Sequence, residues 1–295
     1  MTADHAPQTP SPTPSDRQAP GRKRYARVLI IAGSDSGGGA GIQADLKTCS
    51  ALGCYGMTAI TAITVQNTLG VSGIHGIPVD ILRGQIDAVV EDIGADAVKI
   101  GMLATPEVVE VVADAIRRHG LRNVVLDPVM VATSGDRLIA PETASVLVRE
   151  LFPLAAVVTP NLDEAALLLG QDITGIEALD GAVQRLLDLG APAALLKGGH
   201  LSGDLVVDLL GYGDGQRLRL QSRRIATHNG HGTGCTLSSA IASHLALGLP
   251  LEAAVARARE YILGAIAAGA DVHTGAGHGP LNHGYAPRAQ VVVQG

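Results

Sequence analysis

A glycine-rich stretch that leads into a helical pattern is the strongest candidate for chemistry in this sequence. Residues 231–236 read HGTGCT, and Leu237, Ile241 and Leu245 follow at the spacing of one helix face. Free backbone N–H groups in the first turn of such a helix form a cup for negative charge. A phosphoryl group in transfer needs such a cup, because its transition state spreads charge over three oxygens. The predicted catalytic residues of this cup are Gly232, Thr233, Gly234 and Cys235.

Cys235 falls in the first turn of that predicted helix, where the pKa of a thiol tends to be lowered. An isolated cysteine at a glycine-rich helix start is usually a small packing residue. The preceding Gly-Thr-Gly favours the functional interpretation, in which the thiol takes part in catalysis.

A second candidate is the stretch 159–164, which reads TPNLDE. Asn161 and Glu164 are three residues apart, so on a nascent helix their side chains face the same way. Such a pair, aimed at a phosphate site, can hold a hydrated Mg²⁺, which keeps several of its waters. The alternative is a capping box, in which Asn161 is the N-cap and Glu164 reaches back to it.

Two apolar runs end in a charged residue. The run 123–127 ends in Asp127, and the run 193–197 ends in Lys197, which glycines follow. In an open parallel sheet, ligands bind beyond the carboxyl ends of the strands. An acid, a lysine and an anion cup on neighbouring strand ends therefore favour phosphoryl transfer from ATP.

The stretch 33–41, GSDSGGGAG, is a glycine loop between a predicted strand and a helix, where backbone can approach a ligand closely. A dinucleotide fingerprint would need an acidic residue after the second strand, and the sequence has Gln66-Asn67 there. There is also no GxxxxGK[ST] motif, which excludes a P-loop. A nicotinamide dehydrogenase is thus a distant alternative.

The elements that must position these residues alternate along the chain. Short apolar runs, typical of buried strands, are followed by helical patterns, so the sequence predicts an α/β fold with a mainly parallel sheet covered on both faces. The clearest helix begins with Thr105 as N-cap and Pro106 in the first turn, and stops at Gly120. The remaining predicted strands are 27–33, 57–65, 97–101 and 155–159, with antiparallel edge strands at 205–210 and 217–225.

The composition of the chain indicates which partners and which compartment to expect. The 295 residues carry a net charge of −6 and no basic run longer than Arg22-Lys23-Arg24, so we expect no nucleic-acid partner. No apolar run approaches the ~20 residues of a membrane helix, so we expect no membrane partner. Three cysteines without a CxxC pair fit a reducing compartment, the cytoplasm. We expect residues 1–25 to be a disordered Pro/Thr/Ser-rich tail and 26–295 to be a single domain.

Several of these stretches, in this order, resemble the ribokinase-like superfamily. Within it, the chain resembles the hydroxymethylpyrimidine/phosphomethylpyrimidine kinases of thiamine biosynthesis, from about Arg27 to Pro280. The matching stretches are IAGSDSGGGAGIQADLKT, TAITVQNT, KIGML, VVLDPVM, TPNLDEA, LLKGGH and HGTGCTLSSAI. The resemblance implies a three-layer α/β/α fold, ATP and Mg²⁺ as cofactors, and a homodimer. It also implies two successive phosphorylations of a small-molecule substrate, first of the hydroxymethyl oxygen and then of the monophosphate.

Carried over residue by residue, the resemblance assigns a pyrimidine pocket to Gln66, Gly33, Asp45, Met102 and Val129. An aminopyrimidine edge offers a ring-nitrogen acceptor beside an amino donor, and the one carboxamide of Gln66 can pair with both. The resemblance assigns the ATP and phosphate region to Asp127, Asn161 and Lys197, and the metal to Glu164.

The sequence departs from the family pattern at a few positions. Thr133 stands where many members have a lysine, Gly230 replaces the usual threonine before HGTGC, and Ser36-Gly37 replaces the commoner Pro-Ser. The nearest alternative function is a pyridoxine/pyridoxal kinase on the same fold, because that ring also bears a hydroxymethyl group. A non-catalytic vitamin-binding sensor is the alternative from another class.

Overall fold

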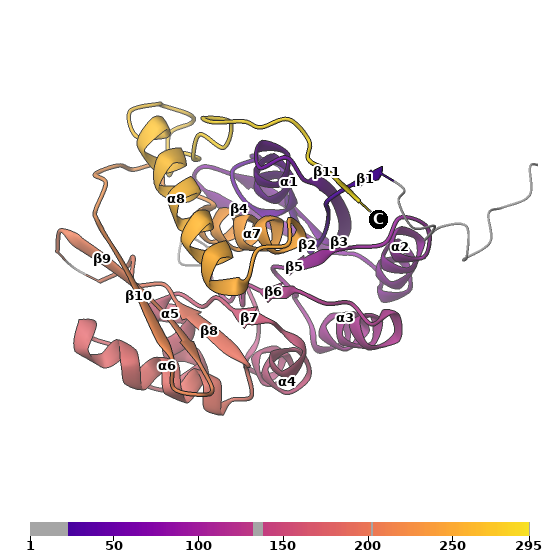
Figure 1. Cartoon of the computed structure of the whole chain (residues 1–295), viewed down its shortest axis with the longest axis horizontal. Coiled ribbons are helices and arrows are strands. Elements are labelled where there is room, and N and C mark those ends of the chain that lie inside the picture. Colours follow the sequence, from indigo (N-terminus) through magenta and orange to yellow (C-terminus); the bar gives the residue numbers. More distant parts are fainter. Residues whose placement is uncertain (1–22, 132–137, 202, 295) are drawn as a thin grey trace, which may run out of the picture.

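A single twisted sheet organises the computed structural model, which describes residues 23–131, 138–201 and 203–294. Within those residues nine strands pair in the order β10-β9-β8-β7-β6-β5-β2-β3-β4 (Figure 1). The pairs from β3 through β2 and β5 to β8 are parallel, and β4, β9 and β10 are antiparallel at the two edges. The strands are β2 (Arg27–Asp35), β3 (Tyr55–Asn67), β4 (Gly70–Gly76), β5 (Ala97–Ile100), β6 (Val124–Leu126), β7 (Val157–Val158), β8 (Ala193–Leu196), β9 (Leu205–Tyr212) and β10 (Arg217–Arg223).

Helices cover both faces of the sheet, which confirms the three-layer α/β/α prediction (Figure 1). One apolar core lies between the sheet and α2 to α6, and the other lies between the sheet and α1, α7 and α8. The central strands are apolar on both sides because each side faces a core. The helices are α1 (Gly41–Ala51), α2 (Val79–Asp92), α3 (Pro106–His119), α4 (Pro141–Leu151), α5 (Leu162–Leu169), α6 (Leu179–Asp188), α7 (Thr233–Ala246) and α8 (Leu251–Gly269).

The strand order reverses at β2. From β2 the chain first adds β3 on one side, then crosses back to place β5 on the other side and continues outward to β8. Such a reversal opens a crevice outside the carboxyl ends of the strands, where ligands bind in doubly wound sheets. The predicted glycine loop follows β2, and Asp127, Asn161 and Lys197 follow β6, β7 and β8.

The predicted helix ends of α3 are confirmed. The Thr105 side chain accepts a hydrogen bond from the Val108 N–H, Pro106 is the first helical residue, and Gly120 adopts a left-handed conformation with φ of 59°. The predicted antiparallel edge strands are also present, with β9 two residues longer and β10 two residues shorter than expected.

Two segments differ from prediction. The second strand runs past residue 65 to Asn67 and folds back as β4, a hairpin that the sequence interpretation missed. Lys23–Tyr25, placed in the disordered tail, instead form β1 and pair with β11 (Val292–Gln294). The remainder of the predicted tail, 1–22, lies outside the described residues, as does Thr133.

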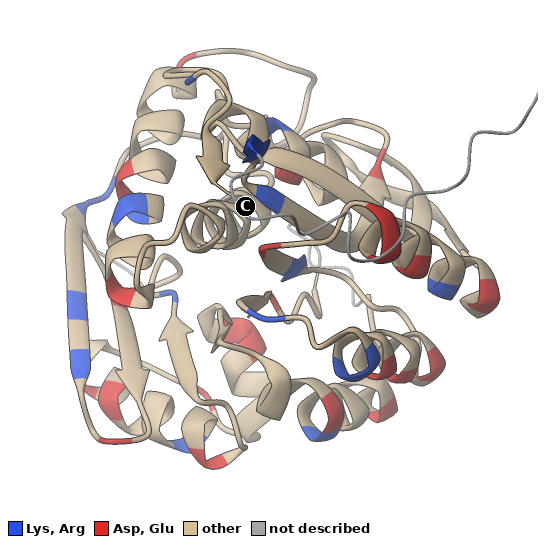
Figure 2. Cartoon of the chain, turned by 45° about the vertical axis from the view of Figure 1, so that its right-hand side comes forward, with Lys and Arg blue, Asp and Glu red and all other residues tan. Residues whose placement is uncertain are grey.

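Charged residues are distributed over the outer helices, with both signs interspersed along the ribbon in the view of Figure 2. Arg118, for example, lies 2.9 Å from both Asp87 and Asp114, which places it between α2 and its own helix α3. No helix in the described part of the chain has the length and apolar character of a bilayer-spanning segment.

Phe152, the single phenylalanine of the sequence, is fully buried at the end of α4 in the larger core. We expect Phe152→Ala to lower the free energy of unfolding by about 3–5 kcal/mol, because a large cavity remains in a close-packed interior. Phe152→Leu should cost clearly less. Urea unfolding of both variants measures the difference, and equal costs would contradict this packing role.

Candidate active site

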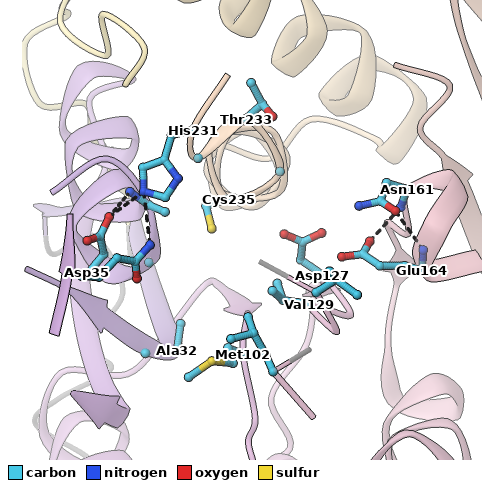
Figure 3. Close-up of a pocket in the computed structure, with 18 of the residues that line it drawn as sticks. Ala32, Asp35, Met102, Asp127, Val129, Asn161, Glu164, His231, Thr233 and Cys235 are labelled. Atoms are coloured by element: carbon cyan, nitrogen blue, oxygen red, sulfur yellow. Dashed lines mark hydrogen bonds and ion pairs between the residues drawn. The ribbon is translucent and has the colours of Figure 1, made fainter. Parts of the chain in front are cut away.

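A cavity of about 260 Å³ lies beyond the carboxyl ends of the strands, at the reversal of strand order. Figure 3 shows Asp35 and His231 at one end, Asn161 and Glu164 at the other, and Cys235 between them. Nearly all of the predicted site residues line it: Gly33, Gln66, Met102, Val129, Asp127, Asn161, Glu164, Lys197, Gly232, Thr233, Gly234 and Cys235. The fold therefore gathers predicted site residues from seven separate segments into one cavity.

The anion cup is the first turn of α7. Gly232 has φ of 82°, and a Cβ there would lie 1.9 Å from the Gly39 carbonyl oxygen, so only glycine lets the two loops approach this closely. Within the described residues, no acceptor is recorded for the N–H groups of Gly234 and Cys235, whereas that of Thr236 bonds to the Gly232 carbonyl. Open donors at a helix N-terminus that faces a cavity form an anion site.

The predicted lowering of the Cys235 pKa is wrong. The thiol is only partly exposed, and burial raises its pKa to about 11 even though Lys99 and the Gly41 N–H act in the opposite direction. Burial disfavours the charged thiolate, and here it outweighs the helix terminus. Cys235 is therefore a protonated thiol at neutral pH in this structure.

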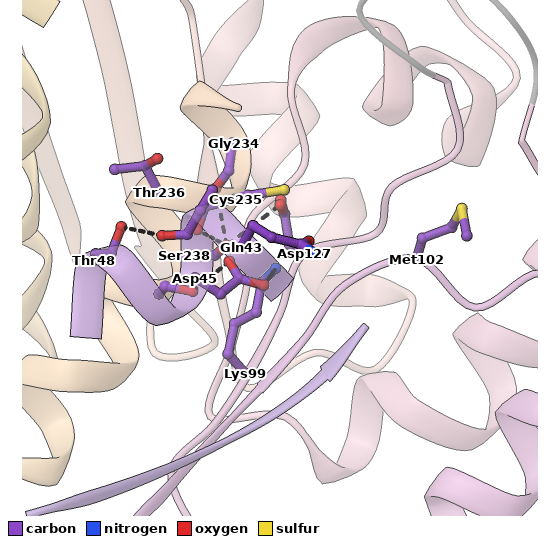
Figure 4. A network of polar contacts seen from close by, with 12 residues as sticks. Gln43, Asp45, Thr48, Lys99, Met102, Asp127, Gly234, Cys235, Thr236 and Ser238 are labelled. Atoms are coloured by element: carbon purple, nitrogen blue, oxygen red, sulfur yellow. Dashed lines mark hydrogen bonds and ion pairs between the residues drawn. The ribbon is translucent and has the colours of Figure 1, made fainter. Parts of the chain in front are cut away.

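Lys99 is a site residue that the sequence interpretation missed. It lies on β5, is fully buried, and its Nζ lies 2.8 Å from Asp45 Oδ2 on α1. Ser239 of α7 donates to the other carboxylate oxygen at 2.6 Å, so Asp45 joins α1, β5 and α7. Figure 4 shows the Asp45 and Lys99 side chains next to each other. Burial by itself would lower the pKa of Lys99, but Asp45, Cys235 and Asp127 hold it above its ordinary value. The sequence feature that could have identified Lys99 as a site residue is its charge within an otherwise apolar strand, AVKI.

Asp45 was assigned to the pyrimidine pocket, and the structure places it elsewhere. Its side chain is fully buried behind Lys99, and Lys99 rather than Asp45 lines the cavity. Because Asp45 is fully buried and accepts from Lys99 and Ser239, it orients the lysine instead of contacting a ligand.

Asp127 and Lys197 form a second ion pair, directly under the cup. Lys197 Nζ lies 2.9 Å from Asp127 Oδ1, and Thr159 donates to the same oxygen at 3.0 Å. Burial alone would raise the pKa of Asp127, but Lys197 and Lys99 hold it below its ordinary value. A carboxylate at this position therefore stays ionised and keeps the Lys197 ammonium charged beside the cavity.

Asn161 and Glu164 do form a capping box at the start of α5, the alternative to a metal site. Asn161 Oδ1 accepts from the Glu164 N–H at 2.9 Å, and Glu164 Oε2 accepts from the Asn161 N–H at 2.8 Å. Burial raises the pKa of Glu164 to about 7. The cap still leaves a carboxyl at the cavity wall, which fits a hydrated Mg²⁺ held by one carboxylate and by substrate phosphates.

Gln66 lies at the opposite end of the cavity, at the end of β3, with Gly33, Met102 and Val129 lining the same space. Two neighbours of Gln66 received no role in the sequence interpretation: His231, 3.3 Å from its amide, and Asp35, 2.9 Å from His231. Both lie within motifs that were recognised, but only the folded chain brings them beside Gln66.

The sheet order, the crevice and the phosphate cup define a small-molecule kinase of the ribokinase-like class. The sequence model of phosphomethylpyrimidine kinase matches residues 35–282, and the chain belongs to that family. The hydroxymethylpyrimidine/phosphomethylpyrimidine kinase of Rhizobium meliloti is 53% identical over 88% of this chain and 97% of its own length.

Solved structures of similar kinases have the same fold as this chain. An ADP complex of Bacillus subtilis pyridoxal kinase superposes with a TM-score of 0.82 and 39% identity, over 88% of this chain and 98% of that one. A phosphomethylpyrimidine kinase structure from Clostridium difficile gives a TM-score of 0.72 and 43% identity, over 81% of this chain and 99% of that one.

We expect Lys99→Met to lower the free energy of unfolding by about 3–5 kcal/mol, because it leaves the buried Asp45 carboxylate without its cation. The double variant Lys99→Met/Asp45→Asn should regain most of that loss, since neither charge remains. Urea unfolding measures both. A double variant no more stable than Lys99→Met would contradict the ion-pair explanation.

The raised pKa of Cys235 predicts slow alkylation at neutral pH. Because only the thiolate reacts, the rate of iodoacetamide labelling should rise by about tenfold per pH unit from pH 7 to pH 10. Mass spectrometry of peptides separates Cys235 from Cys49 and Cys54, which are buried. A rate that levels off below pH 8.5 would show that the pKa is lowered after all.

Proposed function

We propose that this protein transfers the γ-phosphoryl group of ATP to 4-amino-5-hydroxymethyl-2-methylpyrimidine, and then a second phosphoryl group to the monophosphate. The product is the pyrophosphate used in thiamine biosynthesis. One observation supports this most directly: a single cavity joins a carboxamide suited to an aminopyrimidine, Gln66, to an anion cup at Gly234 and Cys235. The names of the relatives point to the same substrates.

In the first step the hydroxymethyl oxygen attacks the γ-phosphorus, the bond to the β–γ bridging oxygen breaks, and ADP leaves. The open N–H groups of the cup and the Lys197 ammonium stabilise charge on the moving phosphoryl oxygens. The thiolate form of Cys235, a small fraction at neutral pH, is the proposed acceptor of the alcohol proton. Mg²⁺, when bound beside Glu164, would neutralise charge on the nucleotide phosphates.

The second step differs because its nucleophile is already an anionic phosphate. No proton needs to be removed, so positioning and charge neutralisation carry the rate. The second phosphorylation should therefore depend on Lys197 more than on the Cys235 thiol. Mg²⁺ and a homodimer remain predictions from the family resemblance, and a cytoplasmic location remains a prediction from the cysteine content.

Pyridoxal kinase activity is the second candidate, because the superposed Bacillus subtilis structure bears that name. A mass-resolved assay with Mg-ATP, run separately on hydroxymethylpyrimidine and on pyridoxal, decides between the two. We expect mono- and then diphosphorylated pyrimidine, with little pyridoxal phosphate. Pyridoxal phosphate as the main product would move the enzyme to vitamin B6 salvage, and binding without turnover would indicate a sensor.

The proton-acceptor role of Cys235 gives a separate prediction. Cys235→Ala should reduce kcat of the first step by about 10²-fold, the low end for a general base, because most of the thiol is protonated at pH 7. The wild-type rate of that step should keep rising from pH 7 to pH 10, while the second step should not. Stopped assays on each substrate measure this, and full activity of Cys235→Ala would overturn the role.

A further inference from the structure

His231 lies where the loop before α7 meets the glycine loop after β2, and its ring is held from several sides. The side chain is buried, and Nε2 lies 2.9 Å from Asp35 Oδ2 (Figure 3). A Cβ at Gly39 would lie 2.5 Å from His231 Cδ2, so the glycine loop packs directly on the ring. The imidazole therefore has one orientation, which points Nε2 at both Asp35 and Gln66.

Asp35 fixes the position of the proton on that ring. Its carboxylate is 2% exposed and accepts from the N–H groups of Gly37, Gly39 and Ala40 at 2.8, 3.1 and 2.8 Å. Burial alone would raise the pKa of Asp35, but His231 and the N–H groups of Ala40 and Gly37 hold it below its ordinary value. A carboxylate only accepts, so Nε2 of His231 must carry the proton.

That proton also decides the orientation of the Gln66 carboxamide. Gln66 Nε2 lies 3.3 Å from His231 Nε2, yet a protonated Nε2 of histidine cannot accept from an amide nitrogen. At the other end of the carboxamide, Thr64 Oγ1 lies 3.1 Å from Gln66 Oε1. The single hydroxyl proton of Thr64 goes to the nearer Ser34 carbonyl, at 2.8 Å, so this hydroxyl can only accept from Gln66.

Both contacts of the carboxamide are satisfied when it is turned by 180°, which leaves its shape unchanged. We propose that the Nε2–H of His231, held toward Asp35, locks Gln66 with its oxygen toward the imidazole, where an amide N–H would be repelled, and with its nitrogen toward Thr64. His231 is thus a positioning residue for substrate recognition.

The lock leaves one N–H and one oxygen lone pair of Gln66 for a ligand, in a fixed order. An aminopyrimidine fits this order in one way, with its amino group at the His231 end and its ring nitrogen at the Thr64 end. This consequence rests on the proposed substrate, whereas the orientation of Gln66 does not. A pyrimidine without the amino group would leave the free lone pair of the Gln66 oxygen without a donor, which sites of this kind reject strongly.

The proton on His231 can be measured directly in the wild-type protein without any substrate. Long-range ¹H–¹⁵N correlation spectra distinguish a protonated from an unprotonated Nε2. We expect Nε2 to be protonated, together with a contact between the Gln66 side-chain amide protons and the Thr64 side chain. An unprotonated Nε2 in the neutral ring would overturn the proposal, whichever substrate the enzyme uses.

His231→Phe tests the consequence for recognition. It should raise KM for hydroxymethylpyrimidine by about tenfold, with a smaller change in kcat, because the N–H that orients the binding group is lost. The preference for hydroxymethylpyrimidine over its analogue without the amino group should shrink by a similar factor. His283→Phe is the matched control, because His283 is also buried and bonds to Thr236 of α7, away from Gln66.

The outcomes separate the two proposals. Loss of preference in His231→Phe but not in His283→Phe supports the positioning role, and equal loss of kcat in both variants with preference intact overturns it. A wild-type enzyme that does not phosphorylate hydroxymethylpyrimidine contradicts the proposed function, and the spectra then decide the orientation of Gln66 by themselves.

Discussion

The first turn of α7 lies against the carboxyl ends of the sheet, and the rest of the site follows from that contact. Open N–H groups in this turn attract anions, but the same approach buries charged side chains below them. The structure compensates with two ion pairs, Lys99 with Asp45 and Lys197 with Asp127. Each pair places a cation beside the cup while keeping the buried charges balanced, so the cavity is prepared for a phosphoryl group before one arrives.

The same buried setting explains why Cys235 differs from a typical first-turn cysteine. A helix N-terminus and a nearby lysine stabilise a thiolate, yet exclusion of water costs the thiolate more. The pKa of about 11 suits a thiol that stays neutral beside two nearby carboxylates, Asp45 and Asp127. Glu164 shows the same effect in a carboxyl group, with a pKa of about 7.

The two ends of the cavity recognise a ligand by different kinds of interaction. At the Glu164 end, charge balance governs the site, because phosphates are recognised mainly by cations and backbone N–H groups. At the Gln66 end, neutral hydrogen bonds govern recognition, and the ligand that can bind depends on which atom of each pair donates. Asp35 links the Gln66 end to the anion cup, since the loop that it caps packs on His231 and, through Gly39, on the start of α7.

The sequence by itself determined the α/β class, the alternation of elements and most of the cavity lining, because parallel strands bring their carboxyl ends to one edge. It also marked Gly232, whose neighbours demand a residue without a side chain. Only the tertiary structure decided that Asp45 holds Lys99 rather than a ligand, and that burial outweighs the helix terminus at Cys235. It alone brought His231 to Gln66, 165 residues apart in the chain. Burial and proton partners depend on contacts between distant segments, and no local pattern encodes them.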